Sequence, residues 1–568
     1  MNRKLKISGR DIFGYLLLGL SVIMLGKSLL LCFSSDIWYD ELFTVGMIEH
    51  SYGDLIAFTA RDVHPPLYYC IVKLVVDLCK LISAQTNPVI VAKMVSVFPY
   101  FILFAYSVTF IRKRFGIFAG GLFLFCVTTM PQLSAYTVEV RMYSFALLFV
   151  TAAFLHGYGT ITAGSGVEEK RREGSRKPIS YPPVRMRRVH AAALIFYGLA
   201  AAYTQYFACV AVIMVYLYVL AVFIIKDRQR IKEWFLWVAI SIVGYAPWLY
   251  ALVNQITAVN DNYWILPLTW RSLGGCVKFV MKPAFTNEVL STILAVILFI
   301  VYAAAFGYEV IKLYHYGRQN EKNAINNGIF IAAGTGVLAG VVMFGFIASK
   351  IIRPIFVYRY MIPALGCFWL SFAVGLHDIW MDTDLCKPED ARNNTDEQDT
   401  VVEHTLRKST KEKISQAVVI IISSFVIVIG LRDYRAFMGE EEYKVLLMEQ
   451  TTEALSSIAP EDIVIYNFDQ VQAVTSYYLD RRIESYLWCG TPETLIQEII
   501  RPYDTVEETQ TIKEWCESGR NVWFIGSFNS REDIVKEWAS EGIRIEETGS
   551  YLLERYWFNL YKASVERQ

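Results

Sequence analysis

The sequence predicts a polytopic α-helical membrane protein with about eleven spans, interfacial helices in its first outer loop and a C-terminal soluble α/β domain. Composition is the first observation: the 568-residue chain has a mean hydropathy of +0.35, with 54% apolar and only 19% charged residues. Soluble domains carry about 25% charged residues, so the expected partner is a lipid bilayer and the expected location is the cell membrane. The net charge is zero, without the basic excess of nucleic-acid-binding proteins, and no nucleic-acid partner is expected.

Long apolar segments are the second observation, because about 20 mostly apolar residues cross a bilayer as a helix. The first of them has no small-residue cleavage site and is expected to remain as an uncleaved helix. The predicted spans lie near residues 11–33, 89–111, 116–133, 142–163, 191–204, 206–225, 234–252, 287–313, 327–347, 357–379 and 416–432.

Basic residues in short loops set the predicted orientation, since such loops stay in the cytoplasm. Lys and Arg gather in residues 3–10, in 112–114, in 226–232 and in the loop 163–190, which has eight of them against three acidic residues. With these loops inside, residues 34–88 form the first outer loop and the chain after 433 lies outside.

Segment 66–83 is apolar, yet we expect it to lie on the membrane rather than to cross it. Lys73, Asp77 and Lys80 follow a spacing that places them on one face of a helix. A span here would also move every later basic loop to the outside. The segment is therefore interpreted as an amphipathic helix in the outer interface.

The chain divides into a membrane module, 1–432, and an extracytoplasmic α/β domain, 433–568, after a polar and predicted cytoplasmic linker at 380–415. Apolar runs that read as strands alternate with helical stretches beyond residue 433, the pattern of an α/β domain. The expected strands are Ile463–Tyr466, Val522–Ile525 and Tyr556–Leu560, and the expected helices are Glu441–Ser456 and Thr505–Glu517.

Two polar clusters in the first outer loop carry the chemistry. Asp40 and Glu41 follow the first span, and Asp62 and His64 precede a Pro-Pro pair that stiffens the chain. Group transfer to a hydroxyl needs a base for its proton, which adjacent carboxylates at the membrane surface can supply. The Asp-x-His spacing suits either a divalent cation or a group that holds the base in place. The alternative is a loop of solvated charges.

Cations near two later outer span ends complete the predicted site. Glu139, Arg141 and Tyr143 precede or begin one span, and Arg359 and Tyr360 begin another. Arginine can take two phosphate oxygens at once, so a lipid-linked phosphate is one interpretation. Snorkelling to lipid headgroups is the other.

These residues, in this order, resemble the C-fold polytopic glycosyltransferases, in particular bacterial relatives of protein O-mannosyltransferases and of the aminoarabinose transferases that modify lipid A. The resemblance covers about residues 10–375. It consists of WYDELFT, DVHPPLYY, the Glu-x-Arg-x-Tyr element of VEVRMYS, YTQYF and RYMIP. The chain departs from the family pattern at Gln205, where many relatives have His.

The resemblance implies an inverting hexosyl- or pentosyltransferase that moves a sugar from a polyprenyl-phosphate donor to an extracytoplasmic acceptor, which is a protein, a lipid or a cell-envelope glycan. It implies Asp40 as catalytic base with Glu41 beside it, and Asp62, His64, Glu139 and Arg141 in the donor pocket. A transporter or lipid flippase is the alternative function, and a receptor a third. A transporter predicts charges near the bilayer midplane and inverted repeats, whereas these charges lie at outer span ends and no repeat is visible.

Overall fold

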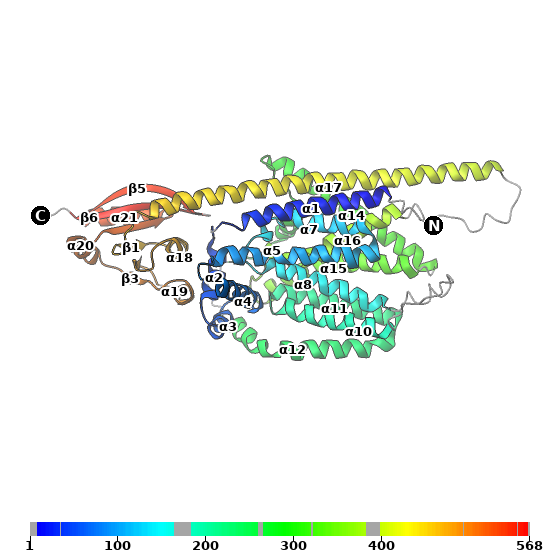
Figure 1. The fold of residues 1–568 in the computed structure, drawn as a ribbon, viewed down its shortest axis with the longest axis horizontal. Coiled ribbons are helices and arrows are strands. Elements are labelled where there is room, and N and C mark those ends of the chain that lie inside the picture. The colour runs from blue at the N-terminus through cyan, green and yellow to red at the C-terminus, as the bar shows by residue number, and fades with distance from the viewer. Residues whose placement is uncertain are drawn as a thin grey trace.

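The protein consists of a helical bundle and a sheet domain at opposite ends of an elongated molecule (Figure 1). The computed structural model describes residues 8–34, 36–163, 183–258, 265–319, 322–381, 398–491, 494–553 and 555–565. Helix α17, Gln398–Leu455, runs along the bundle and continues into the sheet domain.

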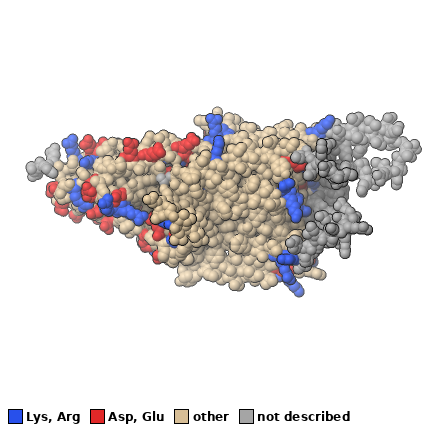
Figure 2. All heavy atoms as spheres, in the orientation of Figure 1, with Lys and Arg blue, Asp and Glu red and all other residues tan. Residues whose placement is uncertain are grey.

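Nine helices in the described residues are long and apolar enough to cross a membrane. The visible face of the bundle is almost free of charged side chains, which gather instead on the sheet domain (Figure 2). The predicted fold class is confirmed. The helices that contribute to these nine segments are α1 Gly9–Leu31, α5 Pro88–Tyr106 with η1 Ser107–Ile111 and α6 Arg112–Phe115, α8 Tyr143–Thr162, α11 Tyr206–Lys226, α12 Ile231–Ala258, α14 Glu288–Gln319, α15 Lys322–Ile351, α16 Ile362–Met381 and α17.

The two other predicted spans are α7, Ile117–Thr129, and α10, Pro183–Ala202. Helix α7 has 13 residues, all of them buried. It packs backbone to backbone on α1, where a Cβ on Gly121 would lie 2.3 Å from the carbonyl oxygen of Gly14. Small residues permit such close helix approach in membranes, so α7 forms part of the bundle's core.

Three helices form the first outer loop at the end of the bundle that faces the sheet domain: α2 Tyr39–Glu49, α3 Tyr52–Arg61 and α4 Leu67–Ile82 (Figure 1). Helix α4 is amphipathic, as the sequence predicts. Lys73 is buried, donates to the Ile48 carbonyl at 3.1 Å and pairs with Asp77 at 3.2 Å. The exposed face of α4 carries Leu74, Leu78, Leu81 and Ile82, an apolar surface suited to the interface of a bilayer.

The sheet domain has strand order β3-β2-β1-β4-β6-β5, with parallel pairing among β1 to β4 and antiparallel pairing of β6 with β4 and β5. The three strands predicted from sequence are confirmed. The predicted linker is helical from residue 398, and its part at 382–397 lies outside the described residues. The strands are β1 Ile463–Tyr466, β2 Glu484–Trp488, β3 Asp504–Val506, β4 Val522–Ser527, β5 Ile543–Leu553 and β6 Tyr556–Val565; the helices are α18 Asp469–Tyr478, α19 Thr494–Ile499, α20 Thr509–Glu517 and α21 Ser530–Ser540.

The sheet domain docks directly on the first outer loop. The Tyr478 hydroxyl accepts from the Ile37 backbone N–H at 3.2 Å, and Arg481 pairs with Glu49 at 2.7 Å. Gly46 lies against the domain so closely that a Cβ there would be 2.7 Å from the Ile499 carbonyl oxygen. The polar cluster of the loop is therefore enclosed between the bundle and the sheet domain.

Candidate functional site

Glu41 joins two segments that come from distant parts of the sequence. It lies in the first turn of α2, and its Oε2 accepts from the Trp38 backbone N–H at 3.2 Å. Its Oε1 accepts from the Val140 backbone N–H at 2.7 Å, which ties α2 to the segment before α8. The side chain is buried, and burial raises the pKa of its carboxyl group to about 7.

Asp40, one residue earlier, makes a different contact. Its Oδ2 is 2.7 Å from Nη1 of Arg359, and both side chains remain partly accessible, at 20% and 22%. Arg359 comes from η4, Tyr358–Met361, at the start of the last span before α17. The structure thus brings two sequence-predicted site residues together across 319 positions of chain.

Arg141 supplies a second cation to the same place. Its Nη1 donates to the Asp40 backbone carbonyl at 2.9 Å and to the Tyr69 hydroxyl at 3.4 Å. Within the described residues, the buried Nε of Arg141 and the buried hydroxyl of Tyr143 have no hydrogen-bond partner. The Tyr143 hydroxyl is within electrostatic reach of both Arg141 and Arg359. Buried polar groups are usually paired, so these two atoms suit a polar ligand.

Asp62 and His64, from a later part of the same loop, also lie close enough to the arginines to feel their charge. Asp62 caps the C-terminal end of α3, and Pro66 precedes α4, whose first residue, Leu67, donates its backbone N–H to the Tyr203 carbonyl at 3.0 Å. Burial raises the pKa of Asp62, with Arg141 acting against the shift. Burial and the positive charges of Arg141 and Arg359 hold the pKa of His64 well below its ordinary value, so His64 is neutral beside them.

Glu139 adds a carboxyl group close to Asp40 and Glu41. Burial, reinforced by the negative charges of these two neighbours, raises the pKa of Glu139 to about 8. Crowded carboxylates of this kind share protons rather than ionise independently. A group that exchanges its proton near neutral pH can serve acid–base chemistry.

Tyr360 and Gln205 have structural contacts. The Tyr360 ring stacks on Phe207 with centroids 4.9 Å apart. Gln205 is buried between α10 and α11, where its side-chain oxygen accepts from the Ala208 backbone N–H at 2.7 Å and so caps α11.

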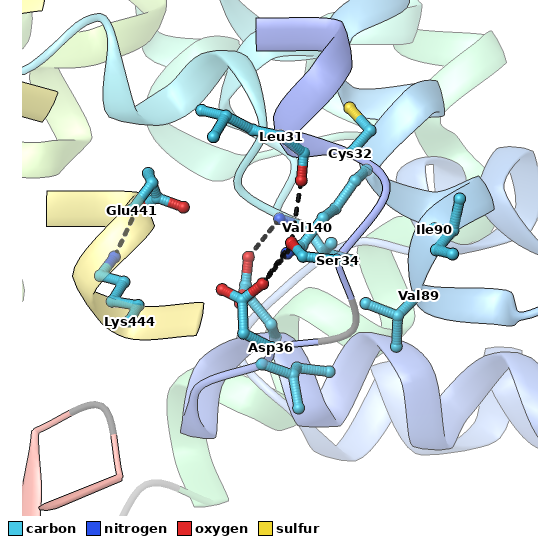
Figure 3. Close-up of polar contacts among 12 residues, drawn as sticks. Leu31, Cys32, Ser34, Asp36, Val89, Ile90, Val140, Glu441 and Lys444 are labelled. Atoms are coloured by element: carbon cyan, nitrogen blue, oxygen red, sulfur yellow. Dashed lines mark hydrogen bonds and ion pairs between the residues drawn. The ribbon is translucent and has the colours of Figure 1, made fainter. Parts of the chain in front are cut away.

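A buried ion pair beneath the loop was missed by sequence reasoning. Lys93 of α5 pairs with Asp36 at 2.6 Å, and its Nζ also donates to the Ser34 hydroxyl at 3.0 Å. Figure 3 shows Ser34 and Asp36 next to Val140, the residue whose N–H binds Glu41. A lysine inside an otherwise apolar span was the available signal, because such residues are rare and paired. Tyr69, the partner of Arg141, is part of DVHPPLYY but had no assigned role.

No group of three or more His, Cys, Asp and Glu side chains in the described part of the chain is arranged to hold a metal ion. The site is instead a set of carboxyl groups, two arginines and tyrosine hydroxyls at the junction of the bundle and the sheet domain. Together, fold and site define a polytopic membrane protein with a polar site at the end of its helical bundle, covered by an α/β domain.

The particular fold is that of ArnT. No protein-family model matches the sequence, and no curated protein matches it. The solved structure of ArnT from Cupriavidus metallidurans in the apo state has a TM-score of 0.51 and 15% identity over 97% of both chains. The resemblance inferred from the motifs is thereby confirmed at the level of the fold, and the structural match extends into the C-terminal domain.

Two further solved structures are similar over most of this chain. ArnT from the same organism bound to undecaprenyl phosphate has a TM-score of 0.49 and 15% identity, covering 97% of this chain and 98% of its own. The archaeal oligosaccharyltransferase AglB from Archaeoglobus fulgidus, in complex with an inhibitory peptide and a dolichol-phosphate, has a TM-score of 0.37 and 9% identity. It covers 90% of this chain and 69% of its own.

Proposed function

We propose that this protein is an inverting glycosyltransferase that moves a sugar from a polyprenyl-phosphate donor to a hydroxyl of an extracytoplasmic acceptor. The observation that carries the proposal is the contact of Asp40 with Arg359 at 2.7 Å, beside Arg141. One carboxylate and two guanidinium groups at a partly accessible point are the groups that such a transfer needs: a base for the acceptor and cations for the leaving phosphate.

In the proposed reaction, the acceptor oxygen attacks the anomeric carbon of the donor sugar while Asp40 takes the hydroxyl proton. The bond between that carbon and the phosphate oxygen breaks, and its electron pair leaves with the polyprenyl phosphate. Arg141 and Arg359 hold the anion that forms. A single displacement from the face opposite the phosphate inverts the anomeric centre.

The remaining site residues bind the donor or position the base in this proposal. Glu41 holds α2 against the Val140 segment, which fixes the neighbouring Asp40. Neutral His64 and the Asp62 and Glu139 carboxyl groups can accept or donate hydrogen bonds to sugar hydroxyls. Tyr143 places its hydroxyl near the donor phosphate, and Tyr360 contributes by packing beside Arg359.

Substitution of Asp40 tests the base. Asp40→Asn in purified protein reconstituted in nanodiscs should lower the release of polyprenyl phosphate from a panel of polyprenyl-phosphate sugars by roughly 10²–10⁴-fold. Asp54→Asn is the matched control, because Asp54 is an exposed carboxylate of the same outer loop that accepts from the Ser51 hydroxyl at 2.7 Å. Near-normal turnover by Asp40→Asn would refute the role of Asp40 as base. If the wild-type protein released polyprenyl phosphate from none of the donors in the panel, a transporter or flippase would be favoured instead.

The proposal also requires the first outer loop and the domain 433–568 to lie on the extracytoplasmic side, because the acceptor arrives there. The distribution of basic loops over the module 1–432 supports this orientation. Single cysteines introduced near Ser51 and Glu440 should react with a membrane-impermeant reagent in intact cells, whereas one at Ser175 should not. The reverse labelling pattern would overturn the orientation and the mechanism that depends on it.

A further inference from the structure

A pocket of about 320 Å³ lies in the sheet domain next to the turn between β5 and β6. We call it the hairpin pocket. Alternate residues of β6 share one face of the sheet, and Trp557 and Asn559 line the pocket from this strand. Ser550 of the neighbouring strand β5 pairs with Asn559 and also lines the pocket. Its lining is Phe528, Arg531, Ser550, Arg555, Trp557 and Asn559.

The lining combines two exposed aromatic rings with two arginines. Trp557 is 62% exposed and Phe528 is 56% exposed, although such large apolar side chains are normally covered. Nη1 of Arg531 donates to the Phe528 carbonyl at 2.6 Å, which holds its guanidinium at the wall, and Nη2 lies 3.6 Å from Glu532. Aromatic faces stack on the apolar faces of sugar rings, and guanidinium groups bind carboxylate or phosphate in a fork.

Polar groups at the other wall suit sugar hydroxyls. Asn559 donates from its side-chain amide to Glu547 at 2.6 Å, which fixes its orientation, and Ser550 contributes a hydroxyl beside it. The volume is within the range of about 300–1,000 Å³ typical of small-ligand sites. Rings, hydroxyl partners and cations together match a sugar chain that bears negative charge.

The hairpin pocket adjoins the candidate active site through Arg555. The guanidinium carbon of Arg555 lies 4.6 Å from the centre of the Trp38 ring, and Trp38 precedes α2 and Asp40. The next residue, Tyr556, donates its hydroxyl to Gln470 at 2.9 Å and is within electrostatic reach of Asp40. A chain bound in the pocket can therefore continue toward the carboxylate proposed as the base.

We propose that the hairpin pocket is an acceptor subsite for an anionic glycan, a sugar chain that carries carboxylate or phosphate groups. The proposal rests on the transferase function above and names the class of its acceptor. An anionic lipid headgroup would pair with the two arginines, but it would make no use of the two exposed rings or of the two hydrogen-bonding side chains. The charged surface of the sheet domain (Figure 2) also favours a water-soluble ligand.

Binding to the full-length protein in neutral-lipid nanodiscs, without donor, tests the subsite. The probes are tetragalacturonate, maltotetraose 6-phosphate and neutral maltotetraose, measured by titration calorimetry. At least one anionic probe should bind about tenfold or more tightly than the neutral one, as expected for a charge-assisted hydrogen bond. Which of the two binds distinguishes carboxylate from phosphate recognition. Equal affinity for all three, or no binding, would overturn the proposal.

Two pocket variants and one control locate the binding. Trp557→Ala and Arg531→Gln should each weaken the anionic probe about tenfold, and thermal unfolding checks that both variants fold. Arg544→Gln, which changes an exposed arginine of β5 outside the pocket lining, should leave affinity unchanged. Equal affinity in the wild type and both pocket variants, or displacement of the probe by vesicles of phosphatidylglycerol, would refute the glycan subsite.

The outcome for the pocket is separable from that for the transferase, because binding needs no donor. Glycan binding lost in the pocket variants, together with release of polyprenyl phosphate from a donor by the wild type, supports both. Release without glycan binding would remove the subsite and leave the transferase. Binding without release from any donor would remove the transferase and leave a glycan-binding domain.

Discussion

Replacing Arg359 by lysine separates the two interpretations of this residue. If Arg359 binds the donor phosphate, the planar fork matters and Arg359→Lys should lose activity although the positive charge remains. If Arg359 only snorkels to lipid headgroups, lysine should serve equally well. The structure favours the first interpretation, because Nη1 is directed to Asp40 at 2.7 Å and the side chain is only 22% exposed.

The size of the effect follows from the contact that is lost. A hydrogen bond to a charged group contributes about 1.5–3 kcal/mol, which corresponds to about 10- to 150-fold in rate. In the proposed mechanism, Arg359 pairs with Asp40 before the donor binds; the donor phosphate then competes for the guanidinium group and frees Asp40 to accept the acceptor's proton. Lysine can make the first contact but cannot take two phosphate oxygens in one plane, so the main loss should appear with donor present.

Single-turnover release of polyprenyl phosphate measures the rate, and a fluorescent polyprenyl phosphate measures donor affinity. Arg359→Lys should lower the rate by the factor above, and Arg359→Ala should also weaken donor binding. Arg271→Lys, at an exposed arginine in the first turn of α13 Trp270–Met281, is the control. Wild-type rate and affinity in Arg359→Lys would refute the phosphate role and leave a membrane anchor.

Three further variants test the surroundings of the site. The raised pKa of Glu41, about 7 against 4.5, means that the folded state binds this proton more tightly. The linked stability, ~3 kcal/mol, is complete below pH ~4.5 and is lost as pH rises toward 7. Glu41→Gln should therefore flatten the melting temperature between pH 4.5 and 7, and a profile parallel to wild type would contradict this. Lys93→Met leaves Asp36 buried without its cation and should destabilise the protein by about 3–5 kcal/mol in denaturant titrations. If adding Asp36→Asn to this variant restores no stability, the broken ion pair is not the cause of the loss. Tyr69→Phe removes a hydroxyl that accepts from Arg141 and should weaken donor binding about two- to tenfold, whereas unchanged affinity would show that this contact positions nothing.

The fold was predictable from sequence where the length of an apolar segment and the spacing of its apolar residues determine the element. The spans near 11–33 and 206–225 correspond to α1 and α11, and the strand Ile463–Tyr466 is β1. Helix α7 shows the limit of this reasoning, because its apolar character serves burial within the bundle and not contact with lipid. The predicted helix Thr505–Glu517 was wrong at its start, because Asp504–Val506 form β3, which pairs with β2 at the edge of the sheet, and α20 begins at Thr509.

The site was predictable as a set of residue types but not as an arrangement. The motif residues Asp40, Arg141 and Arg359 could be named, yet their mutual contacts depend on helix packing across distant parts of the chain. The docking of the sheet domain on the outer loop, through Tyr478 and Arg555, had no signal in the sequence. Long-range pairs of this kind leave no local period to detect.

Adjacent carboxylates at the start of α2 take different roles because a helix turns about 100° per residue. Asp40 faces Arg359 at a partly accessible point, while Glu41 turns to the Trp38 and Val140 backbone N–H groups and is 6% exposed. A base must meet the acceptor, and Glu41 has both oxygens engaged by backbone. In the proposed mechanism, proton transfer therefore belongs to Asp40 and positioning to Glu41. If Glu41→Gln lowers the rate because Asp40 is misplaced, the Val140 amide should also become less protected against hydrogen exchange. Asp40→Asn should lower the rate and leave that protection intact.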